Sequence, residues 1–151
     1  MLVTVKVGGR TLQSGLSGTL VHDLEERLTK DRTVPGHGGG KEVTDIANAL
    51  SKPQKFVISP EGFRSRYTDK STAEIYTMVM SGKINKQLVL ALQSHGIPAV
   101  GLSGLDGLLL QAERKKSLIV VDEEGRKRVE EKFYRESMRA NDDERYSQRL
   151  R

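Results

Sequence analysis

The feature that most constrains this chain is a glycine cluster placed between an apolar segment and a helical pattern, and it occurs twice. Residues 2–7 alternate around apolar positions and end at Gly8-Gly9, which predicts a buried strand running into a tight loop. The second cluster, His37-Gly38-Gly39-Gly40, opens a segment whose apolar residues recur at helical spacing. This order of strand, glycine loop and helix is typical of an α/β protein.

The remaining segments continue the same alternation. Apolar periodicity predicts helices around residues 20–30, 43–50, 70–80 and 84–94, the last two separated by a break at Ser81-Gly82. Short apolar runs predict strands over residues 55–58, 98–102, 108–112 and 117–121. A weak strand is expected over residues 32–36, because Pro35 lacks a ladder donor and Gly36 weakens pairing. We therefore expect a three-layer αβα sandwich with a mainly parallel sheet.

The charges are unevenly distributed along the chain. Its 151 residues are a typical length for one domain, and their formal net charge is +5. All of this net charge lies on residues 1–121, since residues 122–151 carry equal numbers of acidic and basic groups. That tail has too few apolar residues for a core. We expect a solvated helix over about residues 129–140 and a frayed end beyond it.

Composition disfavours several classes of function. The chain has no cysteine, which excludes disulfides, thiolate zinc sites and cysteine nucleophiles and fits a cytoplasmic protein. No apolar run is long enough to cross a membrane. Aromatic residues make up 5% of the chain and do not alternate with basic ones, so we expect no nucleic-acid binding despite the positive charge. The 3 histidines are scattered and form no metal-binding pattern.

Both glycine motifs have the composition of an anion site. Lys6 would end its strand beside Gly8 and Gly9, whose backbone N–H groups can approach phosphate oxygens. The alternative is an ordinary strand-to-helix turn with a surface lysine. Residues 37–40 would place exposed N–H groups and a helix dipole at one point, although a flexible loop is the alternative there.

Three further segments carry weaker signals. The arginines of Arg64-Ser65-Arg66 can grip a carboxylate in two places, or they are simply solvated residues before a capped helix. Residues 82–86 form a basic helix start, for which a solvated helix face is the simpler interpretation. Residues 101–107 form a glycine-rich loop in which Ser103 or Asp106 would support a site from behind.

Taken together and in this order, these motifs resemble the amino acid kinase family over residues 1–129. The segments that carry the resemblance are Lys6-Val-Gly-Gly, His37-Gly-Gly-Gly, Ser65-Arg-Tyr-Thr-Asp69, Gly82-Lys-Ile-Asn-Lys86 and Gly101-Leu-Ser-Gly-Leu-Asp-Gly107. Within the family the chain is similar to the acetylglutamate kinases. It is more similar to the kinases of lysine and arginine biosynthesis that act on aminoadipate or glutamate carried by the small acidic protein LysW. Residues 65–69, 104–107 and 114–116 favour that group.

The resemblance implies phosphoryl transfer from ATP with Mg²⁺ to a side-chain carboxylate, which gives an acyl phosphate. It implies that Lys6 is the catalytic stabiliser of the transferring phosphoryl group. The phosphate-binding residues would be Gly8 and Gly9, and the substrate-binding residues would be Gly39, Gly40 and Arg66. Supporting roles fall to His37, Gly38, Asn85, Ser103 and Asp106, and no residue is assigned to a metal.

The chain departs from the family pattern after residue 129. We therefore expect residues 1–129 to be the substrate-binding half, residues 130–151 to be a charged helical or frayed tail, and the ATP-binding half to be absent. Such a chain would turn over ATP weakly or not at all while still binding an acidic substrate. Alternatives are an acetylglutamate kinase acting on an N-acylated amino acid and a non-catalytic substrate-binding fragment.

Two expectations about partners follow from charge and from the missing half. Lysine and arginine near the substrate would steer the acidic carrier LysW toward the site. A sheet edge or apolar face left uncovered would favour a homo-oligomer or a partner chain.

Overall fold

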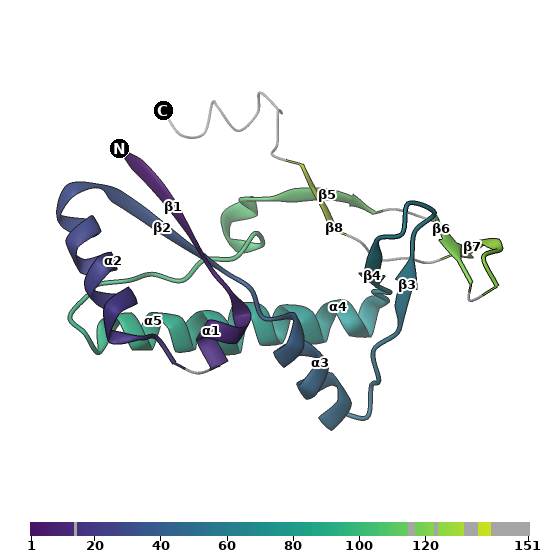
Figure 1. The fold of residues 1–151 in the computed structure, drawn as a ribbon, viewed down its shortest axis with the longest axis horizontal. Coiled ribbons are helices and arrows are strands. Elements are labelled where there is room, and N and C mark those ends of the chain that lie inside the picture. Colours follow the sequence, from purple (N-terminus) through teal and green to yellow (C-terminus); the bar gives the residue numbers. More distant parts are fainter. Residues whose placement is uncertain (14, 115–116, 123, 132–135, 140–151) are drawn as a thin grey trace. The chain divides into compact units, whose positions relative to one another are not determined.

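The computed structural model describes residues 1–13, 15–114, 117–122, 124–131 and 136–139 (Figure 1). The chain divides into two compact units, and each has its own hydrophobic core. The first unit comprises residues 1–53 and 74–101, and the second comprises residues 54–73 and 102–151. No helix among the residues described is both long and apolar enough to cross a membrane.

A parallel pair of strands lies at the centre of the first unit. Strand β1 (Leu2–Val7) runs parallel to β2 (Arg32–His37), and helices α1 (Gly9–Gln13) and α2 (Gly18–Lys30) connect them. The predicted strand over residues 2–7 is confirmed. The weak second strand also forms, one residue longer than expected. Pro35 is compatible with β2 because β2 pairs only with β1 among the described strands, so one of its edges needs no ladder donor.

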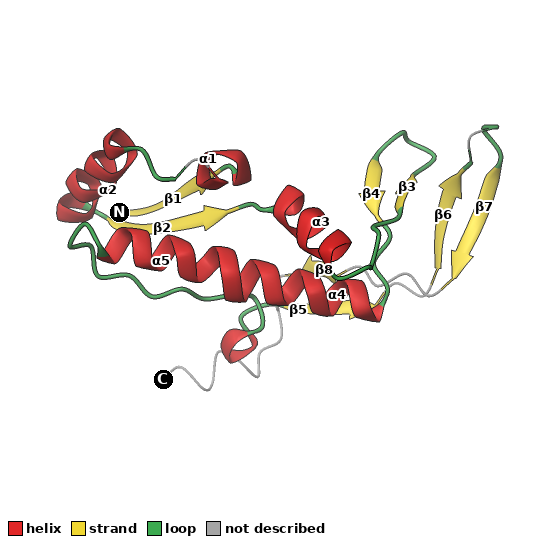
Figure 2. Ribbon diagram, turned by 90° about the horizontal axis from the view of Figure 1, so that it is seen from below, coloured by secondary structure: helices red, strands yellow, loops and turns green. Residues whose placement is uncertain are grey.

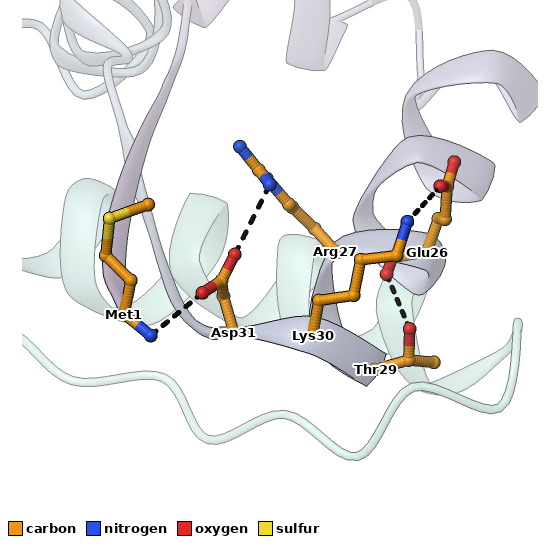
Figure 3. Close-up of polar contacts among 6 residues, drawn as sticks. All are labelled: Met1, Glu26, Arg27, Thr29, Lys30 and Asp31. Atoms are coloured by element: carbon orange, nitrogen blue, oxygen red, sulfur yellow. Dashed lines mark hydrogen bonds and ion pairs between the residues drawn. The ribbon is translucent and has the colours of Figure 1, made fainter.

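Asp31, at the junction between α2 and β2, ties the beginnings of the two strands together (Figure 3). Its carboxylate lies 2.9 Å from the Met1 ammonium nitrogen and 3.3 Å from Arg27 Nη1. The N–H of Arg32 donates a hydrogen bond to the Met1 carbonyl at 3.0 Å. A slip of one residue would turn every side chain to the opposite face, so these contacts determine which residues end the two strands side by side.

Helices cover one face of this strand pair. The buried cluster joins α2 to α5 (Asn85–Gln93) and includes Val21, Leu24, Leu88, Leu92 and Ile97, with Val5 of β1 packed against it. Figure 2 shows α5 running along the strand pair. A second cluster, made by Val43, Val79 and Ile84, joins α3 (Gly40–Ala49) to the helix that precedes α5. Val7 is thus buried and Val5 partly buried, whereas Lys6, between them on β1, is exposed.

The break predicted at Ser81-Gly82 is wrong, because the helix continues through it. Helix α4 (Lys70–Thr77) passes into a π-helical segment, η1 (Met78–Ile84), which passes into α5. A glycine inside a helix costs about 1 kcal/mol relative to alanine. Val79 and Ile84 are buried on either side of Gly82, and their burial outweighs that cost.

The second unit is built from antiparallel strands. Its larger sheet has the order β4-β3-β6-β7, and its smaller sheet pairs β5 with β8. The strands are β3 (Phe56–Ile58), β4 (Arg64–Arg66), β5 (Gln111–Arg114), β6 (Ser117–Val121), β7 (Lys127–Glu131) and β8 (Glu136–Arg139), with a short helix η2 (Asp106–Leu108) before β5. Among described strands only β1 and β2 pair in parallel, which differs from the mainly parallel sheet expected. A connection as short as residues 59–63 can join two neighbouring strands only when they are antiparallel.

Residues 98–102 do not form the predicted strand. Pro98 has no N–H to donate, and two carbonyl groups of the segment are bonded to side chains of the preceding helix instead of to a neighbouring strand. Gln93 Nε2 donates to the Ala99 carbonyl at 3.3 Å, and Lys86 Nζ donates to the Gly101 carbonyl at 3.0 Å. The strand predicted over residues 108–112 begins later, at Gln111, because residues 106–108 form η2.

The helix predicted over residues 129–140 is wrong wherever the structure describes that segment. Residues 127–131 pair with β6, with Val129 opposite Ile119, and residues 136–139 pair with β5. A hairpin turn at Glu124-Gly125 returns the chain directly along β6. This pairing overrides the weak helical pattern. Residues 132–135 and 140–151 lie outside the described residues.

The N-cap of α2 offers a test of the first unit. Ser17 caps this helix, and its Oγ accepts the Leu20 N–H at 3.2 Å. Ser17→Ala should lower the free energy of unfolding by about 1 kcal/mol, while Ser17→Asp should restore it. Chemical denaturation of the three proteins measures this. Equal midpoints for wild type and Ser17→Ala would show that the cap adds nothing.

Candidate functional site

The two glycine motifs meet at one end of the parallel strand pair. Lys6 lies opposite Gly36 in the register, and Val7 lies opposite His37, so both strands end at the same level. The N–H of Gly38 donates to the Val7 carbonyl at 3.1 Å and joins the second loop to the end of β1. The carboxyl ends of parallel strands are where open α/β sheets bind ligands.

The backbones of the two loops touch at Gly9. A Cβ atom built on Gly9 would lie 2.9 Å from the Gly39 nitrogen and 3.1 Å from the Gly38 carbonyl carbon. Backbone atoms cannot rotate away as the end of a side chain can. A Cβ on Gly8 would instead meet only Thr11 Oγ1, at an ordinary 3.7 Å. Gly9 is therefore required for the contact between the loops, whereas Gly8 is sterically unconstrained.

Helix α3 begins at this contact without a side-chain cap. Gly39 is its N-cap residue and makes no side-chain capping hydrogen bond, and the Val43 N–H donates to the Gly39 carbonyl at 3.1 Å. The positive end of the α3 dipole therefore points toward the loops. His37 belongs to the same turn, where its Nδ1 lies 3.4 Å from the Gly38 carbonyl oxygen.

Gly39 also packs closely against the π-helical segment. A Cβ there would overlap Ile84 Cδ1 and would lie 2.9 Å from Met80 Sδ. These apolar side chains pack against the second glycine loop. Sequence patterns did not indicate their role, since a π-helical turn has no distinctive residue signature. π-Helical turns are frequently found beside functional sites.

Two lysines lie near the loops, and they differ in availability. Lys6 is exposed, and no described residue makes a hydrogen bond or ion pair with its ammonium group. Lys41 follows Gly40 directly, but its Nζ donates to Asp45 Oδ2 at 2.8 Å. This hydrogen bond raises the pKa of Lys41 above its ordinary value. Of these two lysines, Lys6 is thus the one available to an anion at the loops.

Asn85 supports the first unit from inside. It is 7% exposed, and Lys86 Nζ donates to its Oδ1 at 3.1 Å and to the Gly101 carbonyl at 3.0 Å. Gly101 packs directly on Asn85, since a Cβ on Gly101 would lie 2.7 Å from Asn85 Cγ. Across the unit, Lys83 Nζ lies 2.6 Å from Glu42 Oε1 and links η1 to α3.

Arg66 belongs to the second unit and lies in the β3–β4 hairpin. Its Nη1 donates to Gln54 Oε1 at 2.6 Å, and its guanidinium carbon lies 5.0 Å from the centre of the Phe56 ring. Arg64 stacks on the same ring at 3.6 Å. The sequence indicated the two arginines, but nothing in its pattern indicated their partners Gln54 and Phe56.

Ser103 and Asp106 hold their own loop together. Asp106 Oδ2 accepts the Ser103 N–H at 2.5 Å and the Ser103 hydroxyl at 2.8 Å. The structure therefore brings together Lys6, Gly8, Gly9, His37, Gly38, Gly39 and Gly40 in the first unit, with Asn85 in the same unit, and places Arg66, Ser103 and Asp106 in the second unit. Among described residues, no group of three or more His, Cys, Asp or Glu side chains is placed to hold a metal ion.

Comparison with known proteins identifies the family. The sequence profile of the amino acid kinase family matches residues 1–146. The chain belongs to the amino acid kinase family. The match continues beyond residue 129, where the resemblance was expected to stop.

Curated relatives give a more specific likeness. A Nitrosopumilus maritimus protein, provisionally named a LysW-aminoadipate/LysW-glutamate kinase, is 48% identical over 85% of this chain and 48% of its own length. A similarly named Cenarchaeum symbiosum protein is 50% identical over 88% of this chain and 49% of its own length. The LysW-aminoadipate/LysW-glutamate kinase of Saccharolobus islandicus is 45% identical over 88% of this chain and 49% of its own length. The chain thus spans about half the length of these relatives.

A solved structure supports the fold alone. The crystal structure of smu.665 from Streptococcus mutans matches with a TM-score of 0.63 and 19% identity, over 74% of this chain and 44% of that one.

The contact between the loops can be tested by alanine substitution at neighbouring glycines. Gly9→Ala should destabilise the first unit by about 1–3 kcal/mol, because its methyl group would force the two backbones apart. Gly8→Ala, with only an ordinary contact, is the matched control and should change stability by less than about 1 kcal/mol. Thermal unfolding measures both. Equal destabilisation by the two substitutions would contradict the close approach at Gly9.

Proposed function

We propose that this chain binds the acceptor and the transferring phosphoryl group in a kinase that phosphorylates the side-chain carboxylate of aminoadipate or glutamate. The observation that carries the proposal is the meeting of the two glycine loops beside Lys6, at the end of β1 and β2. Backbone N–H groups, a helix N-terminus and an ammonium group there suit a phosphoryl group that carries negative charge. The names of the relatives supply the acceptor class.

The roles follow from chemistry at each position. A carboxylate oxygen of the acceptor forms a bond to the γ-phosphorus of ATP, and the bond from that phosphorus to the leaving oxygen of ADP breaks. Lys6 and the backbone of Gly8 and Gly9 stabilise the charge on the transferring group. Gly39 and Gly40 hold the acceptor close to its reacting carboxylate. Arg66 binds the other carboxylate, and no covalent enzyme intermediate is required.

ATP is the expected co-substrate, with Mg²⁺ supplying neutralisation of phosphate charge when it is bound. The described carboxylates do not form a set for the ion, since Asp106 is bonded to Ser103 and no acidic cluster is present among the residues described. No step is therefore assigned to Mg²⁺ on this chain. The nucleotide pocket is proposed to lie in the part of the relatives that this chain does not match.

The finer architecture belongs to the same proposal. Residues 1–129 would be the substrate-binding half, and residues 130–151 would be a charged tail. The parallel pair β1–β2 would be part of a larger, mainly parallel sheet in a three-layer αβα sandwich. Support comes from the parallel register of the pair and from the helices packed on it.

The proposed partner is LysW, which would present the amino acid on an acidic protein. The positive charge of residues 1–121 would attract such a carrier, and its association would weaken as salt rises. An N-acylated amino acid, the substrate of an acetylglutamate kinase, is the small-molecule alternative. The reaction would take place in the cytoplasm, which the absence of cysteine supports. Self-association stays a prediction.

A second candidate is a substrate-binding fragment without catalysis. The observation that favours it is coverage of only 48–49% of each relative's length. It shares the acceptor site with the first candidate and differs only in turnover.

Binding and turnover assays separate these outcomes. We expect calorimetry to show binding of LysW-aminoadipate or LysW-glutamate, and hydroxylamine trapping with ATP and Mg²⁺ to show little or no acyl phosphate. Robust acyl phosphate formation by the 151-residue chain would overturn the fragment candidate. Failure to bind either carrier-linked acceptor or N-acetylglutamate would overturn the proposed function.

The two lysines at the loops provide a matched comparison. Lys6→Ala should weaken binding of inorganic phosphate by about fivefold or more, because it removes the cation beside the glycine loops. Lys41→Ala should change it by less than about twofold, since Lys41 is paired with Asp45. Titration of both variants measures this. Similar losses in the two would contradict the role given to Lys6.

A further inference from the structure

The β3–β4 hairpin places two arginines over one aromatic ring. Phe56 lies directly opposite Arg66 in the antiparallel register, and Ile58 lies opposite Arg64. The guanidinium carbon of Arg64 is 3.6 Å from the centre of the Phe56 ring, and that of Arg66 is 5.0 Å from it. Both distances are within the range of a cation–π interaction. One ring therefore draws two like charges to the same place.

Arg66 is restrained by a hydrogen bond in addition to its contact with the ring. Arg66 Nη1 donates a 2.6 Å hydrogen bond to Gln54 Oε1, from a residue two positions before Phe56. Because Gln54 is neutral, this bond orients the guanidinium group without cancelling its charge. Arg66 is half-buried, whereas Arg64 is exposed. The geometry resembles an oriented cation with a second cation beside it.

We propose that Phe56 and Gln54 are positioning residues that hold Arg66, with Arg64 beside it, for the non-reacting carboxylate of the acceptor. This inference rests on the proposed function and deepens it by naming what orients the substrate-binding arginine. Stacking uses the face of a guanidinium group and leaves its in-plane N–H donors directed away from the ring. Those donors form the fork that matches a carboxylate. Arg64 adds positive charge at the same point and favours acceptors with more than one acidic group.

Holding Arg66 in one orientation before the ligand binds would raise its affinity for a carboxylate. A free arginine loses rotamer freedom when it binds a carboxylate, and that loss reduces affinity. Here the ring and the amide oxygen restrict Arg66 in the unbound chain. The structural alternative is that the arginines only shield the apolar Phe56 ring from water. In that case, any apolar residue at position 56 would leave carboxylate binding unchanged.

The test compares aromatic and aliphatic residues at position 56 in the full 151-residue chain. N-acetylglutamate is the probe, and N-acetylisoglutamine, which keeps the side-chain carboxylate but carries an amide in place of the α-carboxylate, is the comparison ligand. Phe56→Leu should weaken binding of N-acetylglutamate by about fivefold, and Phe56→Tyr, which keeps the ring face, should stay within about twofold of wild type. Gln54→Ala should also weaken binding of N-acetylglutamate. Wild type should bind N-acetylglutamate more tightly than N-acetylisoglutamine, which lacks the carboxylate assigned to Arg66.

A matched control lies in the same hairpin. Phe63 is 71% exposed near the turn, and Phe63→Leu makes the same chemical change away from the stacked arginines. It should leave the dissociation constant unchanged. Equal affinities for wild type and Phe56→Leu, or equal losses for Phe56→Leu and Phe63→Leu, would overturn the positioning role while leaving the proposed function standing.

A second measurement does not depend on ligand binding or on comparing variant stabilities. Nitrogen-15 NMR of the Arg66 side chain reports rotation about the Cζ–Nε bond, which should be slow in wild type and Phe56→Tyr and faster in Phe56→Leu. Free rotation in wild type would overturn the inference alone. Slow rotation without binding of either probe would instead overturn the proposed function, and the inference with it.

Discussion

The backbone contact between Gly9 and the Gly38-Gly39 turn is the constraint on which the rest of the first unit depends. It exists only because β1 and β2 run parallel and end at the same level, with Val7 opposite His37. The first loop has no room for a side chain at Gly9, since a Cβ there would lie 2.9 Å from the Gly39 nitrogen. The register set at Asp31 and the packing of Ile84 beneath Gly39 both serve this contact.

The chemistry of the site follows from that contact. Ligands of open α/β sheets bind at the carboxyl ends of parallel strands, and glycines there allow backbone N–H groups to come close to an anion. Lys6 is exposed at this end, whereas Lys41 is held by Asp45 along α3. The second unit contributes a separate element, an arginine pair oriented on Phe56. Under the proposed function, these elements bind the transferring phosphoryl group and an acceptor whose side-chain carboxylate is phosphorylated.

Local sequence patterns predicted the elements that short-range physics determines. The strands over residues 2–7 and 117–121 and the helix after the second glycine motif follow from short apolar runs and helical spacing. The glycine motifs also identified the residues that meet at the end of the strand pair. The roles assigned to these residues stay predictions until ligand binding is measured.

The features that were missed depend on partners distant in sequence. The π-helical turn replaces a predicted break because buried Val79 and Ile84 hold the helix through Gly82. Residues 98–102 lack a strand because side chains of α5 take the carbonyl groups of Ala99 and Gly101. Strand pairing with β6 and β5 overrides the weak helical pattern after residue 129. Gln54 and Phe56 gained their significance only when the hairpin placed them beside Arg66.

The central claim is that the two glycine loops form one anion site with Lys6. The most direct measurement is a titration of the nitrogen-15-labelled chain with inorganic phosphate, followed by NMR. The amide signals of Gly8, Gly9, Gly39 and Gly40 should shift together with a single dissociation constant, which Lys6→Ala should raise. Signals of the two loops that shift with different constants, or that do not shift while other regions do, would contradict a shared site.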